Sequence, residues 1–232
     1  MKKRICTLLL ALCLTLGLLP AAAQAAGDGS GTFDTVRWTL DADGGLTVSG
    51  TGDLPDGAFA GRTDIVTVTF TGQVARIGRS AFAGCTQLRR VDGFGAVTCV
   101  MSQAFAGCTA LTELPLPDDV AWVEPRLCEN CTALQNIVLP AAMTEVPRGL
   151  LRGCTGLRRV TLQGAVTAVG NGAFAGCDAL ADVYFTGTRA QWDAVAVGAN
   201  NARLTAAAVH LSAPAHTYPE AWTVVRAPTC TD

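Results

Sequence analysis

The sequence is poor in the residues that most often carry catalysis. It contains only two histidines, His210 and His216, so most of the chain has no histidine to act as a general base. The G-x-S-x-G motif of many serine hydrolases does not occur either. Aromatic residues make up 6% of the chain and charged residues 16%. These shortages disfavour an enzyme, and we expect no cofactor and no metal site.

Long hydrophobic runs are also scarce, because only residues 5–19 form one. A basic start, Lys2-Lys3-Arg4, precedes this run, and Pro20 and a stretch of small residues follow it. The run is shorter than the roughly 20 residues needed to cross a bilayer. We therefore interpret residues 1–25 as a signal peptide cleaved after Ala25 or Ala26, which predicts export. An uncleaved membrane anchor is the alternative.

Lysine is missing from the rest of the chain. Removal of residues 1–25 takes away three of the 17 basic residues and none of the 19 acidic ones, leaving arginine as the only strong base and a net charge of about −5. Nucleic acids and anionic lipids attract concentrated positive charge. We therefore expect no nucleic-acid partner and no membrane insertion after signal cleavage.

Half of the residues are hydrophobic, and many of them recur with a period of 23. The tetrapeptide Ala-Phe-Ala-Gly begins at Ala58, Ala81, Ala104 and Ala173. Five cysteines share the same spacing: Cys85, Cys108, Cys131, Cys154 and Cys177. Arg62 occupies the equivalent place one period earlier. Six repeats follow from this register.

The repeats align in apolar columns. The three longest are Ile65, Leu88, Leu111, Leu134, Leu157 and Leu180; Val68, Val91, Leu114, Ile137, Val160 and Val183; and Phe70, Gly93, Leu116, Leu139, Leu162 and Phe185. Only Gly93 departs from its column. The second and third columns lie two residues apart, the spacing of one strand face, as in Leu111–Leu116. We expect one short strand per repeat, stacked at ~4.8 Å into a solenoid.

A further column contains glycine in five repeats and Asn130 in the sixth. Because asparagine is the side chain that best tolerates a left-handed backbone, we expect positive φ at this column, at the end of a short helical turn. The preceding Ala-Phe pair becomes Leu127-Cys128 and Leu150-Leu151 in two repeats. These exchanges roughly conserve volume, which predicts an internal position.

Both ends of the repeat array carry atypical segments, as solenoid caps do. We assign residues 26–53 to a leader and an N-terminal β-hairpin cap, with strands at residues 36–40 and 46–48, and interpret Gly27–Gly31 as a flexible leader, not a phosphate-binding loop. Residues 54–187 form the solenoid, and residues 188–211 a C-terminal cap with Thr188 as helix N-cap and Trp192 covering the core. We expect residues 212–232 to be a flexible tail, the truncated start of another module.

The eight cysteines that remain after cleavage leave two interpretations open. The stacked column favours reduced thiols packed in the core, but adjacent rungs would bring the Cα atoms within disulfide reach. Cys128 and Cys131 form a C-x-x-C pair, which we interpret as core residues and not as a zinc or redox site. Asn130 matches a glycosylation sequon but lies in the tight-turn column. Cys99 lies in a chemically mixed column and is expected to be a surface thiol.

The outward positions of the predicted strands are the candidate binding surface. They are Thr67, Arg90, Glu113, Asn136, Arg159 and Asp182 in one column, and Thr69, Asp92, Thr161 and Tyr184 in the next. Arg90 and Glu113, and likewise Arg159 and Asp182, are predicted to be neighbours of opposite charge. A solvated ladder that only keeps the sheet soluble is the alternative to a binding face.

The repeats between Ala58 and Phe185 resemble those of the BspA-like leucine-rich-repeat family of bacterial surface proteins, which run roughly A-F-x-x-C-x-x-L-x-x-V-x-L-P. The resemblance implies a leucine-rich-repeat solenoid, β-rich with short parallel strands and short helical turns. It also implies a secreted or cell-surface protein that binds a protein or glycan of a host or neighbouring cell, possessing no catalytic activity. The alternatives are a structural spacer in a larger surface protein and a carbohydrate-active enzyme.

Overall fold

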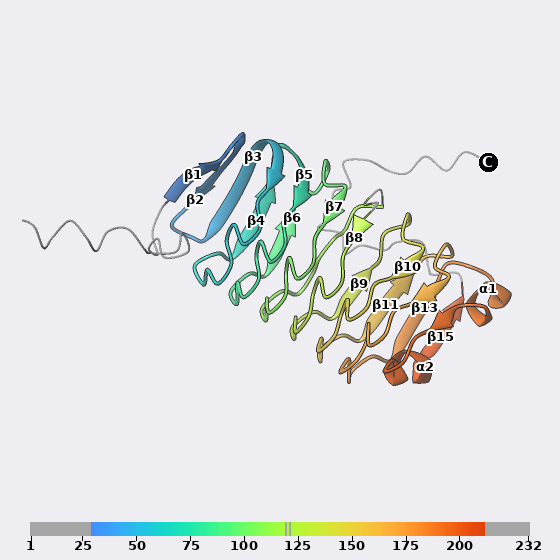
Figure 1. Ribbon diagram of the computed structural model, residues 1–232. Helices are drawn as coiled ribbons and strands as arrows, with labels where there is room; N and C mark the ends of the chain where they lie inside the picture. Colours follow the sequence, from blue (N-terminus) through green and yellow to red (C-terminus); the bar gives the residue numbers. More distant parts are fainter. Residues whose placement is uncertain (1–28, 119, 121, 212–232) are drawn as a thin grey trace, which may run out of the picture.

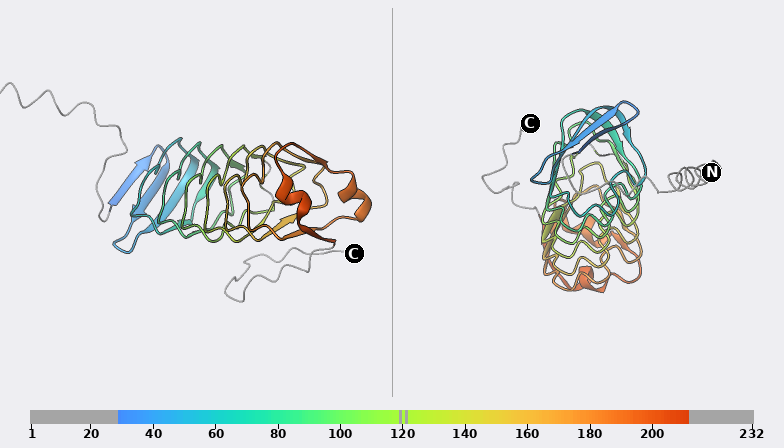
Figure 2. Two further views of the ribbon diagram at one scale, coloured as in Figure 1. Left: turned by 90° about the horizontal axis from the view of Figure 1, so that it is seen from below. Right: turned by 90° about the vertical axis from the view of Figure 1, so that its left-hand side faces the viewer.

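The computed structural model describes residues 29–118, 120 and 122–211. The predicted signal peptide and tail lie outside these residues. The described chain forms an elongated solenoid whose turns stack along one axis from β1 to the helices α1 and α2 (Figures 1 and 2). We call each 23-residue turn a rung.

The strands predicted from the sequence form one side of the solenoid, which we call the first ladder. It consists of β4 (Thr67–Phe70), β6 (Arg90–Asp92), β9 (Asn136–Val138), β11 (Arg159–Leu162), β13 (Asp182–Phe185) and β15 (Ala208–Leu211). Paired strands are parallel and equivalent residues face one another, for example Val160 and Val183. The apolar columns are buried, apart from Gly93. The stacked register is therefore confirmed.

The third rung departs from the predicted strand pattern. Residues 111–116 were expected to form a strand, but the structure has none there, and the first ladder falls into two parts. Pro115 explains the gap, because proline has no N–H to donate to a neighbouring strand. Leu111 and Leu114 are nevertheless buried, so the side-chain column continues where the strand does not.

A second set of strands, the second ladder, was not predicted. It consists of β5 (Gln73–Ile77), β7 (Cys99–Val100), β8 (Trp122–Val123), β10 (Glu145–Val146), β12 (Ala168–Val169) and β14 (Ala196–Val197). The expectation of one strand per repeat is therefore wrong. The buried positions here, such as Val74 and Ile77, are three residues apart, so they lack the period of two that identifies a strand.

A ladder of turns closes the third side. Its glycine column has positive φ in every rung, from 72° at Gly107 to 75° at Gly176, and Asn130 follows at 62°, which confirms the expectation. The segment forms consecutive turns that are not assigned as a helix, and it bonds to the next rung: the Phe82 N–H donates to the Ala104 carbonyl at 2.8 Å. Such bonds satisfy the backbone groups of an otherwise irregular segment.

The interior is filled by stacked side chains. The Phe82 ring lies 5.4 Å from that of Phe59 and 5.3 Å from that of Phe105, both in stacked orientation. Leu127, Cys128, Leu150 and Leu151, which replace Ala-Phe, are all buried as predicted.

The exception in the third apolar column has a simple compensation. Gly93 adopts a φ of 78°, and a Cβ there would meet the Phe70 carbonyl oxygen. The following residue, Phe94, is buried instead and lies 5.7 Å from the Phe70 ring. A one-residue shift thus keeps the column filled.

The N-terminal cap is larger than predicted. The hairpin of β2 (Val36–Leu40) and β3 (Gly45–Leu54) is confirmed, and β1 (Gly29–Phe33) pairs antiparallel with β2. The interpretation of a flexible leader is therefore wrong from Gly29 to Gly31. Phe33 and Trp38 meet the Phe59 ring edge-on, at 5.6 and 5.5 Å, and so cover the end of the aromatic stack.

The C-terminal cap contains the predicted helix start and one unpredicted helix. Thr188 caps α1 (Arg189–Asp193) in a capping box with Gln191, and Trp192 packs 5.4 Å from Phe185. The second helix, α2 (Ala202–Ala206), follows Asn201, whose buried amide bonds the Phe174 N–H and the Gly170 carbonyl, both at 3.0 Å. Asn201 ties the cap to the last complete rung.

Candidate functional site

The ten candidate residues lie on the outer face of the first ladder, and none of them is buried. Strand pairing joins them in register. Thr67 faces Arg90 and Thr69 faces Asp92 in the N-terminal part; Asn136, Arg159 and Asp182 form one row of the C-terminal part, and Thr161 and Tyr184 lie in the next. Glu113 lies between them on the third rung, which has no strand in the first ladder. The face therefore has two halves.

The C-terminal half carries a cluster of aromatic and charged side chains. The Arg159 guanidinium lies 5.4 Å from the centre of the Tyr184 ring, in cation–π geometry. The Tyr184 ring stacks on His210 at 4.7 Å. His210 Nε2 lies 2.8 Å from Asp182 Oδ1. We call Arg159, Asp182, Tyr184 and His210 the aromatic cluster.

The charge pattern differs from the simplest expectation. Arg159 and Asp182 are register neighbours as predicted, but Asp182 pairs with His210 while Arg159 covers Tyr184. In the N-terminal half, the Arg90 Nε bonds Asp92 Oδ1 at 2.8 Å along the same strand. His210 is the residue that the sequence argument missed, because it lies in the cap beyond the last repeat, yet β15 extends the ladder by one strand.

The described cysteines pack inside the solenoid, apart from Cys99. Cys85, Cys108, Cys131, Cys154 and Cys177 are buried free thiols, as is Cys128, whereas Cys99 is half-exposed. Hydrogen bonding to the Cys128 thiol and burial raise the pKa of Cys131 well above its ordinary value. Among the described residues, no group of three or more potential ligands is arranged to hold a metal ion.

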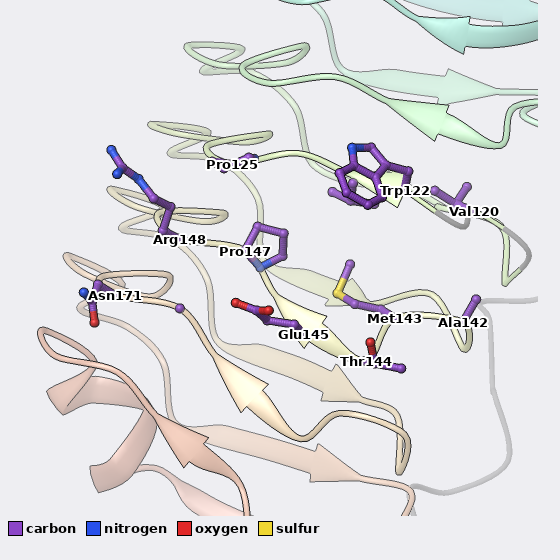
Figure 3. A pocket seen from close by; sticks show the side chains of 12 residues that line it. Val120, Trp122, Pro125, Ala142, Met143, Thr144, Glu145, Pro147, Arg148 and Asn171 are labelled. Atoms are coloured by element: carbon purple, nitrogen blue, oxygen red, sulfur yellow. The ribbon is translucent and has the colours of Figure 1, made fainter.

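A groove on the second ladder was not predicted. It has a volume of about 600 Å³ and runs between the third and fourth rungs, with Val120 and Ala142 at one end and Arg148 and Asn171 at the other (Figure 3). Trp122, whose side chain is 60% exposed, lines it together with Pro125, Met143, Glu145 and Pro147. Several of these residues lie one 23-residue period apart, such as Trp122 and Glu145, but the repeat alignment does not show that a groove opens between their rungs.

The groove coincides with a break in strand pairing. In the described chain, no pairing joins β8 to β10, which belong to separate sheets. On other rungs, a backbone N–H at the end of the second-ladder strand donates a hydrogen bond to the preceding rung. The Met101 N–H donates to Ile77 O at 3.0 Å, and the Glu124 N–H donates to Val100 O at 2.9 Å. Pro147 occupies this position on the fourth rung and has no N–H to donate to Val123. The turn ladder remains bonded there, since the Phe105 N–H donates to Leu127 O at 3.0 Å.

No helix in the parts of the chain that the structure describes is long and apolar enough to cross a membrane. The predicted signal peptide is not among those parts.

Comparison with known proteins agrees with the repeat register. The family model described as "BspA type Leucine rich repeat region" matches residues 52–181 in six copies. No curated protein matches the chain.

Two solved structures share the fold. A leucine-rich-repeat protein of T. pallidum (TpLRR) is 24% identical, with a TM-score of 0.54 over 68% of this chain and 86% of its own. A leucine-rich repeat protein of Eubacterium ventriosum is 22% identical, with a TM-score of 0.58 over 66% of this chain, and only 42% of its own length is covered.

Proposed function

Because the chain belongs to the BspA-type leucine-rich-repeat family, we propose that it is a secreted or cell-surface bacterial protein that binds a macromolecule of a host or neighbouring cell through the first ladder. The proposal includes export by the signal peptide and a role in adhesion. It includes no catalytic step. A protein is the partner that suits the face better than a glycan, since the candidate residues lie along paired strands in both halves of the first ladder and the groove lies on the second ladder.

The aromatic cluster is the observation that carries the proposal. Tyrosine and arginine are enriched among the side chains that dominate binding energy at protein interfaces. Here Tyr184 is held between the Arg159 guanidinium and the His210 ring, so it presents a pre-ordered surface that loses little side-chain entropy on binding. A ladder that only maintained solubility would not need a stacked tyrosine.

Substitution of the ladder tests this proposal. The chain without residues 1–25 would be fluorescently labelled, and its binding to epithelial cells and to other bacteria measured by flow cytometry. We expect the triple variant Arg90→Ala, Arg159→Ala, Tyr184→Ala to lose at least about tenfold in apparent affinity. Arg158→Ala is the matched control, because Arg158 is exposed next to Arg159 but outside the candidate face. Unchanged binding by the triple variant would exclude the first ladder as the binding face.

A further inference from the structure

The groove at the break of the second ladder has the features of a ligand site. Its volume of about 600 Å³ falls in the range of sites for small ligands, roughly 300–1,000 Å³. Trp122 is the most exposed of the large hydrophobic side chains in the described residues, at 60%. This exposed indole gives the open groove a flat apolar surface on which a ligand ring can pack.

The break that opens the groove comes from the sequence itself. Pro147 removes the rung-to-rung donor at this step, while the turn ladder on the opposite side keeps its hydrogen bonds. Among the described residues, the two rungs are therefore joined by the turn ladder and by the Ala142 N–H, which donates to Asp118 O at 3.1 Å, while no strand pairing joins β8 to β10. This arrangement supplies a cleft without loosening the core, since Met143 beneath it is buried.

The polar groups around the groove are available for a ligand. Among the described residues, neither the Glu145 carboxylate nor the Arg148 guanidinium forms an ion pair or a side-chain hydrogen bond. Asn171 accepts a hydrogen bond from the Ala199 N–H at 2.9 Å through Oδ1, which fixes its side chain. Among the described residues, its NH₂ group donates no hydrogen bond. The groove thus offers one acceptor group, one cationic donor and one amide donor.

We propose that the groove binds a neutral oligosaccharide, with a sugar ring stacked on Trp122 and its hydroxyls bonded to Glu145, Arg148 and Asn171. A pyranose ring has an apolar C–H face that packs on a flat indole and a rim of hydroxyls that both donate and accept. One carboxylate and one guanidinium balance each other, which disfavours an anionic or cationic ligand. The open, elongated form of the groove (Figure 3) suits a chain of sugars.

An extended peptide fits this site less well. A peptide that added a strand to the broken ladder would need backbone donors and acceptors along the groove. Pro125 and Pro147 line it and have no N–H. A proline-rich peptide would require several aromatic side chains, and Trp122 is the only aromatic residue among those that line the groove.

Isothermal titration of the chain without residues 1–25 tests the inference. The probes are cellotetraose, mannotetraose and maltotetraose, with a proline-rich decapeptide as the competing class. We expect at least one tetrasaccharide to bind with a dissociation constant of about 1 mM or tighter, and Trp122→Ala to weaken it at least about tenfold. Glu145→Gln should also weaken it.

Cys99→Ala is the matched control, because Cys99 faces Trp122 in strand register but does not line the groove. It should change the affinity less than about twofold. An unchanged unfolding temperature for Trp122→Ala would show that the variant is as stable as the natural protein, so that weaker sugar binding does not come from unfolding. The inference is overturned if no tetrasaccharide binds at about 10 mM, if only the peptide binds, or if Trp122→Ala leaves sugar binding intact. It does not depend on the proposed function, since the groove contains none of the first-ladder candidates.

Discussion

The Sγ of Cys108 lies 3.2 Å from the carbonyl oxygen of Phe82, 26 residues earlier in the chain, and donates its hydrogen to it. All five column cysteines repeat this contact, at 3.0 to 3.2 Å. Cysteine therefore does more than fill a small space: it packs as an apolar side chain and adds a second hydrogen bond to a carbonyl of the preceding rung that already accepts a backbone N–H. An alanine in this column would fill less volume and donate nothing.

This placement predicts a sharp division in thiol reactivity. In the native protein we expect a thiol reagent at pH 8 to modify Cys99, which is half-exposed, far faster than the six buried thiols between Cys85 and Cys177. In denaturant all of them should react. Peptide mass spectrometry of both samples reads the difference. Cysteines that remain unmodified in denaturant until a reductant is added would instead show disulfides between rungs.

Stability should fall in alkaline solution. Burial raises the pKa of Cys85 and of Cys177 from 9.0 to about 12. The unfolded chain therefore releases these protons first, so their contribution to stability is complete below pH 9 and is lost as the pH rises from about 9 to 12. Each thiol contributes a slope of up to about 1.4 kcal/mol per pH unit. Urea unfolding at pH 8, 9 and 10 measures this slope.

The control for the alkaline prediction is the double variant Cys85→Ala, Cys177→Ala. Its free energy of unfolding should be lower at pH 8 but decline less steeply with pH. An equal slope in the variant and the natural protein would show that other groups cause the decline.

The leucine column should be essential for stability. Leu134 is fully buried in the middle of the column, so Leu134→Ala should lower the free energy of unfolding by about 2 to 5 kcal/mol. Gln135→Ala, at an exposed position next to it, should change it by less than about 0.5 kcal/mol. Denaturant unfolding of the two variants gives both values. A loss below about 0.5 kcal/mol for Leu134→Ala would place this column outside the core.

Two glycines offer a matched test of the turn ladder. Gly107 has a φ of 72°, and an added Cβ would find its nearest neighbour 3.6 Å away, so Gly107→Ala should lose about 1 to 2 kcal/mol from backbone strain alone. Gly95 is not among the positive-φ glycines and has open space around it. Gly95→Ala should be neutral or stabilising by up to about 1 kcal/mol. Equal effects in chemical denaturation would contradict a left-handed turn column.

The sequence was most informative at repeat positions that hold the same kind of side chain in nearly every rung. The cysteine, leucine and glycine columns predicted the register, the core and the positive φ of Asn130. The second positive-φ position of each rung was missed because it holds different residues, such as Ser80, Gln103 and Arg126. Their conformation is imposed by the bonds of the neighbouring rungs and not by the residue type.

The candidate surfaces depended on contacts that a column alignment does not contain. The pairing of His210 with Asp182 joins the cap to the last repeat. The two residues are 28 positions apart, so the 23-residue period does not align them. The groove beside Trp122 lies where Pro147 has no N–H for the rung-to-rung bond, and a single proline in a loop-rich repeat is easily read as an ordinary turn residue.

The most direct test of the account is to locate the bound partner on the solenoid. Cross-linking the chain to the cells that it binds would isolate the partner protein, and hydrogen–deuterium exchange would then compare the free chain with its complex with that protein. The account predicts slower amide exchange on complex formation in β9, β11, β13 and β15, which carry the aromatic cluster, and unchanged exchange in β5 and β7. Protection confined to the second ladder or to the turn ladder would contradict it.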